Sequence, residues 1–171
     1  MTDISTSNIL AAQKFLNPAQ KLLINDIEIV LSRIENFDHI SDYSFLVAPA
    51  AKAYEGYLKD FFLKIGLIDK YTHQSDRFRV GKTLNPSLRY KRFSIFQKLA
   101  DIDNNGEALA ETLWDAWKFG RNQIFHYFPN SLQSLDRPEA ENRIGLILKA
   151  IIESGEFYAR HQNDRSILLN K

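Results

Sequence analysis

Cysteine is absent from this sequence of 171 residues, and its charges nearly cancel, with a formal net charge of +1. The lack of cysteine excludes a disulfide scaffold, a zinc site with thiolate ligands and a cysteine nucleophile. The lack of net charge excludes a general attraction to nucleic acid or to a membrane surface. Any affinity of that kind must therefore come from a local patch of charge.

Long apolar runs are absent as well. No stretch approaches the length that a transmembrane helix needs. The first residues, MTDISTSNILAAQKF, have neither the basic start nor the long apolar run of a signal peptide. We therefore expect a cytoplasmic protein that does not bind membranes. With 44% hydrophobic and 25% charged residues, the composition is that of a globular protein, and the length fits one domain.

Apolar residues at helical spacing dominate the rest of the chain. The pattern predicts four main helices, at about residues 17–34, 44–66, 107–126 and 137–160. We expect an all-α fold, a single helical domain over residues 17–165 that forms an antiparallel four-helix bundle. Residues 1–16 precede it as an N-terminal arm or a short helix.

Proline, glycine and small polar residues mark the expected helix ends. Asn17 suits the cap of the first main helix, and Asp136 suits the cap of the last. Pro49 either kinks the second helix or marks a later start near Ala48. Gly66 is a natural stop for that helix.

The segment between the second and third helices, residues 67–105, has a different pattern. Two short β-like runs, residues 78–80 and 88–90, are separated by Gly81 and a turn sequence. They predict a small hairpin or an irregular loop. A short helix at residues 94–100 follows.

The same segment contains a run of basic residues with no acidic residue among them. The aromatic residues Phe78, Tyr90 and Phe93 are interleaved with it. In a chain of almost no net charge, such a run suits a phosphate backbone whose bases stack on the rings. A solvated loop, or a site for an acidic partner such as an antitoxin, is the alternative. The candidate RNA-binding residues are Arg77, Arg79, Lys82, Arg89, Lys91, Arg92 and Tyr127. Tyr127 follows the third helix, and its alternative interpretation is a core residue.

The stretch WDAWKFGRNQIFHYFPN, residues 114–130, places Arg121, Asn122 and His126 among aromatic residues. Asn122 and His126 share a helix face, whereas Arg121 lies roughly 140° from His126 on an ideal helix. Histidine exchanges protons near neutral pH, and the arginine fork matches phosphoryl oxygens. RNA carries its own nucleophile, the 2′-hydroxyl, so this set suits its cleavage without a metal. The other histidines form no metal-binding pattern, and we expect no cofactor.

On these residues the sequence resembles the HEPN ribonucleases. RNQIFH, residues 121–126, matches the Arg-Asn-x-x-x-His form of their motif, which in that family lies on the third long helix of a four-helix bundle. The resemblance implies a metal-independent endoribonuclease that acts as a toxin or an antiphage effector. It also implies a homodimer in which two such motifs share one cleft, and a neutralising antitoxin.

A second match is to the acidic helix of RNase LS-type toxins. The segment SDYSFLVAPAAKAYEGYLKDFF, residues 41–62, contains Asp42 and Glu55 at the thirteen-residue spacing found there. The resemblance covers residues 18–160, and it implies that both carboxylates belong to the same catalytic site as His126.

Each candidate also has a plainer structural interpretation. His126 could be a buried histidine bonded to a neighbour, and Arg121 could pair with Glu55 only to hold two helices together. Asp42 could be a helix cap, and Trp117 could serve the core or a dimer contact. The chain would then be a non-catalytic HEPN-like module that binds nucleotide or protein, or a helical adaptor.

Overall fold

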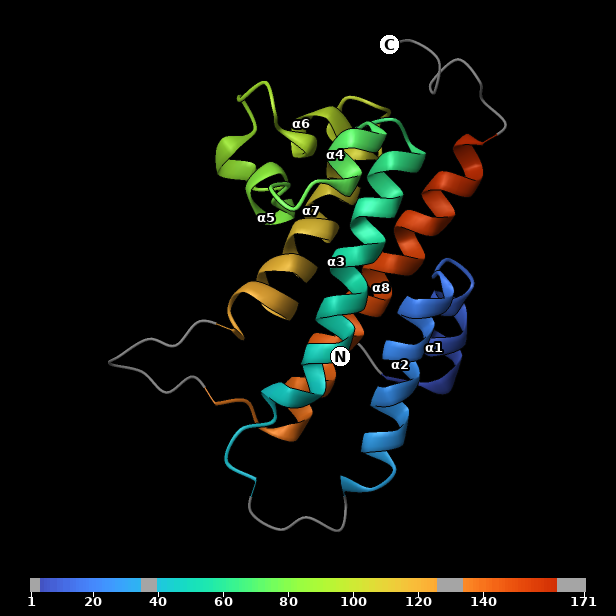
Figure 1. The fold of residues 1–171 in the computed structure, drawn as a ribbon, viewed down its shortest axis with the longest axis vertical. Helices are drawn as coiled ribbons and strands as arrows, with labels where there is room; N and C mark the ends of the chain where they lie inside the picture. The colour runs from blue at the N-terminus through green and yellow to red at the C-terminus, as the bar shows by residue number, and fades with distance from the viewer. Residues whose placement is uncertain (1–3, 35–39, 126–133, 163–171) are drawn as a thin grey trace.

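The computed structural model describes residues 4–34, 40–125 and 134–162, and every regular element in these ranges is helical (Figure 1). The prediction of an all-helical fold is confirmed. In chain order the elements are α1 (Thr6–Gln13), α2 (Pro18–Leu31), α3 (Ser44–Lys64), α4 (Lys70–Gln74), α5 (Val80–Thr83), η2 (Pro86–Leu88), α6 (Ile95–Ala100), α7 (Gly106–Trp117), η3 (Lys118–Asn122) and α8 (Arg137–His161). In these parts of the chain, no helix is long and apolar enough to cross a bilayer.

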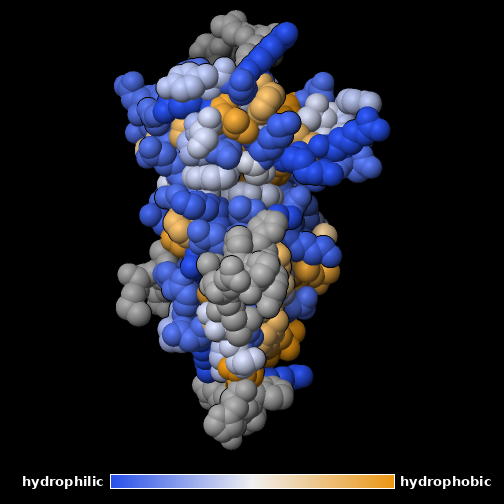
Figure 2. Space-filling model, turned by 90° about the vertical axis from the view of Figure 1, so that its left-hand side faces the viewer, coloured by the Kyte–Doolittle hydropathy of each residue, from blue (hydrophilic) through white to orange (hydrophobic). Residues whose placement is uncertain are grey.

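The molecule is elongated, and α3 runs along its long axis (Figure 1). α3 packs against α2 and α8, α7 packs on α8, and α1 also lies against α8. The short helices α4 to α6 form a lobe at one end, which we call the insertion (residues 67–105). Figure 2 faces the side that carries this lobe; its upper part is mostly hydrophilic around a hydrophobic patch, and further hydrophobic patches lie in its lower half.

Several helices start at the polar residues that the sequence places before them. The Asn17 side chain accepts a hydrogen bond from the Gln20 N–H at 3.0 Å, and Gln20 Oε1 accepts one from the Asn17 N–H at 3.0 Å. This capping box satisfies two backbone donors that the helix leaves free. Asp136 caps α8 by accepting from the Glu139 N–H at 2.8 Å, and Ser94 caps α6. The predicted starts of these helices are confirmed.

α3 begins at Ser44 and continues through Pro49, so the alternative of a later start near Ala48 is wrong. Proline withholds one backbone N–H from the helix, but packing of α3 on both α2 and α8 offsets that loss. The predicted stop at Gly66 is confirmed, because Gly66 has a φ of 73° and the N–H groups after the helix return to its last carbonyls in a Schellman end.

The small hairpin is not formed, and the irregular alternative is correct. Val80 is the first residue of α5, and Leu88 is the last residue of η2, so the two runs belong to separate helical turns. The Lys82 N–H donates to the Arg79 carbonyl at 3.1 Å, and the Asn85 side chain caps η2. Runs of three residues are too short to keep a strand ladder against such local bonds.

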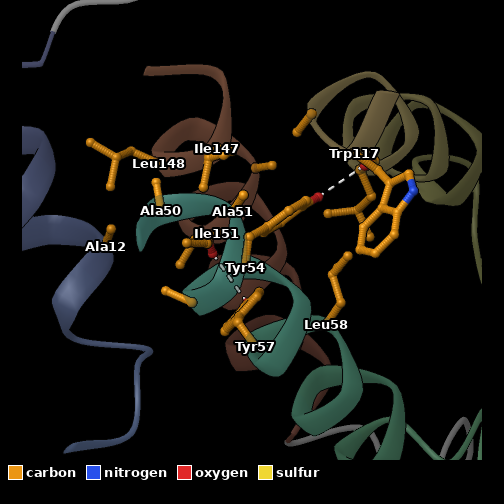
Figure 3. Close-up of a cluster of buried hydrophobic side chains, with 14 of the residues drawn as sticks. Ala12, Ala50, Ala51, Tyr54, Tyr57, Leu58, Trp117, Ile147, Leu148 and Ile151 are labelled. Carbon is orange, nitrogen blue, oxygen red and sulfur yellow. Dashed lines mark hydrogen bonds between the residues drawn. The ribbon is translucent and has the colours of Figure 1, made fainter. Parts of the chain in front are cut away.

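Two buried tyrosines of α3 join it to α7 and α8 (Figure 3). Tyr54 is fully buried and donates its hydroxyl hydrogen to the Leu113 carbonyl of α7 at 2.9 Å. Tyr57 donates to the Ile151 carbonyl of α8 at 3.2 Å and lies 2.9 Å from the Ser154 hydroxyl. Burial raises the pKa of both tyrosines, so they remain protonated donors. The core thus fixes α7, which leads into the candidate site, against α3.

Candidate functional site

The candidate site begins where α7 changes into a π-helical turn. α7 ends at Trp117, and η3, a π-helix, covers Lys118–Asn122, so the α-helix ends earlier than predicted. The Gln123 N–H donates to the Lys118 carbonyl at 3.0 Å, one residue further back than in an α-helix. This wider turn places residues five apart above one another. π-helical turns are rare in proteins, and those that do occur are often found at functional sites.

Arg121 lies between a carboxylate of α3 and an indole of α7. Its Nη2 is 3.8 Å from Glu55 Oε2, and its guanidinium carbon is 5.1 Å from the centroid of the Trp117 ring. Glu55 also lies 4.0 Å from Lys59 Nζ. The expected contact with Glu55 is therefore present, as an ion pair that is longer than a hydrogen bond. Both side chains of the pair are 35% exposed, so part of the guanidinium is accessible to a ligand.

Two residues that the sequence analysis missed hold the π-helical turn in place. Arg143 of α8 donates from Nη1 to the Phe119 carbonyl at 3.1 Å and to Gln123 Oε1 at 3.3 Å. Gly120 is buried, and a methyl group on it would lie 2.8 Å from the Ile147 side chain. These contacts join positions far apart in the chain, so no local sequence signal could have revealed them.

The insertion reaches the site through Gly81 of α5. A Cβ atom on Gly81 would fall 2.4 Å from Nε1 of the Trp117 indole, so the two residues are in direct contact. Trp117 is 5% exposed, as expected for a core residue. It also supports the Arg121 guanidinium. In the sequence, Gly81 is only a break between two short β-like runs, so its contact with Trp117 could not be predicted.

Asn122 is the last residue of the π-helical turn and is partly buried. His126 and Tyr127 lie outside the described residues, so their roles remain predictions from the sequence. Two other histidines, His73 and His161, are each paired with an aspartate elsewhere in the fold, at 2.8 and 3.0 Å.

Asp42 lies at the start of α3. Its Oδ1 accepts hydrogen bonds from the N–H and the hydroxyl of Ser44, at 3.0 and 2.7 Å, and from the Leu135 N–H at 3.1 Å. Burial alone would raise the pKa of Asp42, but these hydrogen bonds outweigh it and hold the pKa below its ordinary value of 3.8. Glu55 lies roughly 16 Å further along α3 than Ser44. Asp42 lies one residue before Tyr43, the N-cap residue of α3, whose side chain makes no capping hydrogen bond. Asp42 instead accepts from the first N–H of the helix, and it also holds the segment before α8.

Replacing Asp42 with alanine is expected to lower the free energy of unfolding by about 1.5–3 kcal/mol at pH 7, because three donors lose a charged acceptor. The pKa of Asp42 is lower in the folded state, so this stabilisation is present above the unfolded pKa and is lost as the pH falls through the folded pKa. Wild type and variant should therefore converge in acid. Urea unfolding at pH 7 and pH 3 measures both effects, and equal stability at pH 7 would contradict the capping role.

The six basic residues of the insertion differ in their surroundings. Arg89 is occupied within the fold: its Nη1 is 2.8 Å from Glu107 Oε1, and its Nε donates to Gln97 Oε1 at 2.9 Å. Its guanidinium also lies 5.3 Å from the Phe96 ring centroid. Arg79 donates to carbonyls of its own turn but remains exposed. The exposed members are Arg77, Arg79, Lys82, Lys91 and Arg92.

Comparison with protein-family models, with curated proteins and with solved structures finds no match for this chain. The function is therefore argued from the residues of the site. Within the described ranges, no group of three or more histidine and acidic side chains is placed to hold a metal ion. The site consists of a partly exposed arginine on a π-helical turn, supported by a carboxylate and an indole, beside a lobe with exposed basic residues.

Proposed function

We propose that the chain is a metal-independent endoribonuclease of the HEPN type, with α2, α3, α7 and α8 as the four helices of an antiparallel bundle. The observation that carries the proposal is Arg121, held by Glu55 and Trp117 at 35% exposure on a π-helical turn shortly before His126. The carboxylate and the indole orient the N–H donors of the guanidinium and leave part of the guanidinium accessible to a ligand. The Arg143 side chain, by contrast, is 16% exposed, and its N–H donors form contacts within the fold.

In the proposed reaction, the 2′-hydroxyl of RNA attacks the adjacent phosphorus, and the bond from phosphorus to the 5′-oxygen breaks. His126 takes the proton of the 2′-hydroxyl or gives one to the leaving 5′-oxygen. The products are a 2′,3′-cyclic phosphate and a 5′-hydroxyl. Arg121 stabilises the negative charge that develops on the phosphoryl oxygens. Asn122 orients His126 or binds phosphate, Glu55 positions Arg121, and Asp42 serves the fold.

The reaction needs both a base and an acid, and each motif supplies one histidine. We therefore propose a homodimer in which the motifs of two chains line one cleft. Phe125, directly before His126, is 49% exposed and would contribute apolar area to that contact. An enzyme that cuts RNA harms its own cell, so the proposal includes a neutralising antitoxin and a role as a toxin or antiphage effector.

Cleavage of a labelled structured RNA in EDTA tests the proposal. Wild type is expected to cut and to leave 2′,3′-cyclic phosphate ends. A folded His126→Ala variant should cut at least about 100-fold more slowly, because it lacks the proton-transfer group. Equal cleavage by both proteins would indicate a contaminating nuclease and contradict the proposal. RNA binding without cleavage, at high protein concentration and with several RNAs, would instead support a non-catalytic module.

A further inference from the structure

The insertion presents an aromatic ring in a basic loop, residues 90–93. Tyr90 is 91% exposed, and the next two residues, Lys91 and Arg92, are exposed as well. Burying an aromatic side chain is favourable, yet this ring stays exposed, although the Arg89 guanidinium carbon lies 6.0 Å from its centroid. Its neighbours in the loop are charged, so the fold gains little from placing a tyrosine here. A ligand that stacks on the ring would explain why a tyrosine stands at this exposed position.

The backbone of this loop is fixed at both ends. The Lys91 N–H donates to the Leu88 carbonyl at 3.0 Å, and the Ser94 N–H donates to the Lys91 carbonyl at 2.8 Å. Ser94 is buried and caps α6. Before the loop, Arg89 is anchored by its ion pair with Glu107. The loop therefore presents its ring and charges in a preorganised form, which lowers the entropy cost of binding.

Further rings and charges continue from the loop toward the candidate site. Phe93 is 42% exposed, and Lys82 Nζ lies 5.0 Å from the centroid of its ring. Lys82 follows Gly81, which contacts the Trp117 indole that supports Arg121. The upper part of the face in Figure 2, on the side of the insertion, shows hydrophilic residues around a hydrophobic patch.

From these contacts we infer that residues 90–93, together with Lys82, bind a single unpaired strand of RNA and lead it toward Arg121, an inference that rests on the proposed function. The two rings stack on bases, and the basic side chains contact phosphates. Bases in a duplex already stack on one another, so exposed rings can engage only an unpaired strand. An acidic protein would pair with the basic side chains, but an RNA strand engages the charges through its phosphates and the rings through its bases, so RNA accounts for both features of the surface.

A fluorescein-labelled 2′-O-methyl oligonucleotide tests the inference without cleavage, because it lacks the nucleophilic hydroxyl. Fluorescence anisotropy should show the single strand binding about tenfold more tightly than its duplex, since only unpaired bases can stack on the rings. Tyr90→Ala is expected to weaken single-strand binding by about tenfold. Lys91→Ala/Arg92→Ala should also weaken it, and should lower the slope of log Kd against log salt by roughly 0.7 for each phosphate that the variant no longer neutralises.

Two controls remove an exposed ring and two exposed positive charges at other places in the fold. Tyr71→Ala removes a ring that is 85% exposed but lies outside the basic run, and Lys52→Ala/Lys149→Ala removes two exposed charges from α3 and α8. Both should bind like wild type. Equal weakening by the controls, equal affinity for the duplex, or wild-type binding by Tyr90→Ala would overturn the inference.

The same measurement separates this inference from the proposed activity. Single-strand binding with the expected pattern, in a protein that does not cut RNA, would support the binding surface and contradict only the ribonuclease. Cleavage by wild type without that pattern of binding would support the ribonuclease and overturn the binding surface. Polyglutamate can be added as a competitor for RNA. If it displaces RNA as efficiently from Tyr90→Ala as from wild type, RNA binds by charge alone, and the role of the ring is overturned.

Discussion

Alanine in place of Arg121 is expected to slow RNA cleavage by about 100-fold or more, while the free energy of unfolding falls by no more than about 1–2 kcal/mol. The chemical loss is large because the guanidinium acts on charge that develops only in the transition state. The structural loss is small because the ion pair with Glu55 is 3.8 Å long and both side chains are 35% exposed. Exposed pairs contribute about 0–1 kcal/mol, and an exposed contact with an indole such as Trp117 about 0.5–1 kcal/mol.

Single-turnover cleavage and urea unfolding of the same variants measure the two effects separately. Arg121→Lys keeps the charge but loses the planar fork, so it should recover only part of the rate. Arg143→Ala is the matched control: its guanidinium donates to the π-helical turn, so its loss should cost more stability than the loss of Arg121. Wild-type cleavage by Arg121→Ala would exclude a catalytic role. A loss of several kcal/mol would show that this arginine mainly joins two helices.

The ends of the helices could be predicted because they depend on residues close by in the chain. Asn17 and Asp136 cap their helices through the N–H three residues further on, and Gly66 adopts the left-handed conformation that ends α3. Signals of this kind do not require knowledge of the rest of the fold.

The prediction failed where the structure depends on contacts between distant positions. The runs at residues 78–80 and 88–90 alternate like strands but are too short to pair, so local helical bonds prevail. The π-helical turn after Trp117 depends on Arg143 and on the close approach of Gly120 to α8. Nothing in the stretch around residues 114–130 encodes these partners.

The candidate site could be predicted in part. The contact between Arg121 and Glu55 could be predicted, because an arginine and a carboxylate on two helices can pair and hold the helices together, and the two side chains lie 3.8 Å apart. The part played by Trp117 could be predicted only in part. Arg121 follows it by four residues, a spacing at which side chains of a helix meet, whereas Gly81 comes from the insertion and no local signal joins it to the indole. Through this indole, the shape of the insertion and the position of the arginine are linked.

Because of that link, a substitution at Gly81 is expected to have a large effect on both stability and cleavage. Gly81→Ala is expected to lower the free energy of unfolding by about 1–3 kcal/mol, although alanine favours a helix more than glycine does. The added methyl group would lie 2.4 Å from Nε1 and 3.0 Å from Cε2 of the Trp117 indole. A rigid ring that is 5% exposed has little room to move in a close-packed interior. Because Arg121 lies on the same ring, cleavage should also fall, by roughly 10- to 100-fold.

Two comparisons test whether the indole is the cause. At Gly56, in the middle of α3, a methyl group would lie 3.2 Å from Gln20 Nε2, a much smaller overlap than at Gly81, so Gly56→Ala should change stability less. In a Trp117→Phe background the indole nitrogen is gone, and Gly81→Ala should cost at least about 0.5 kcal/mol less than in wild type. Strict additivity of the two substitutions in thermal unfolding would show that the methyl group does not meet this ring. The contact between the insertion and the support of Arg121 would then have no energetic consequence, and any loss of cleavage in Gly81→Ala would need another cause.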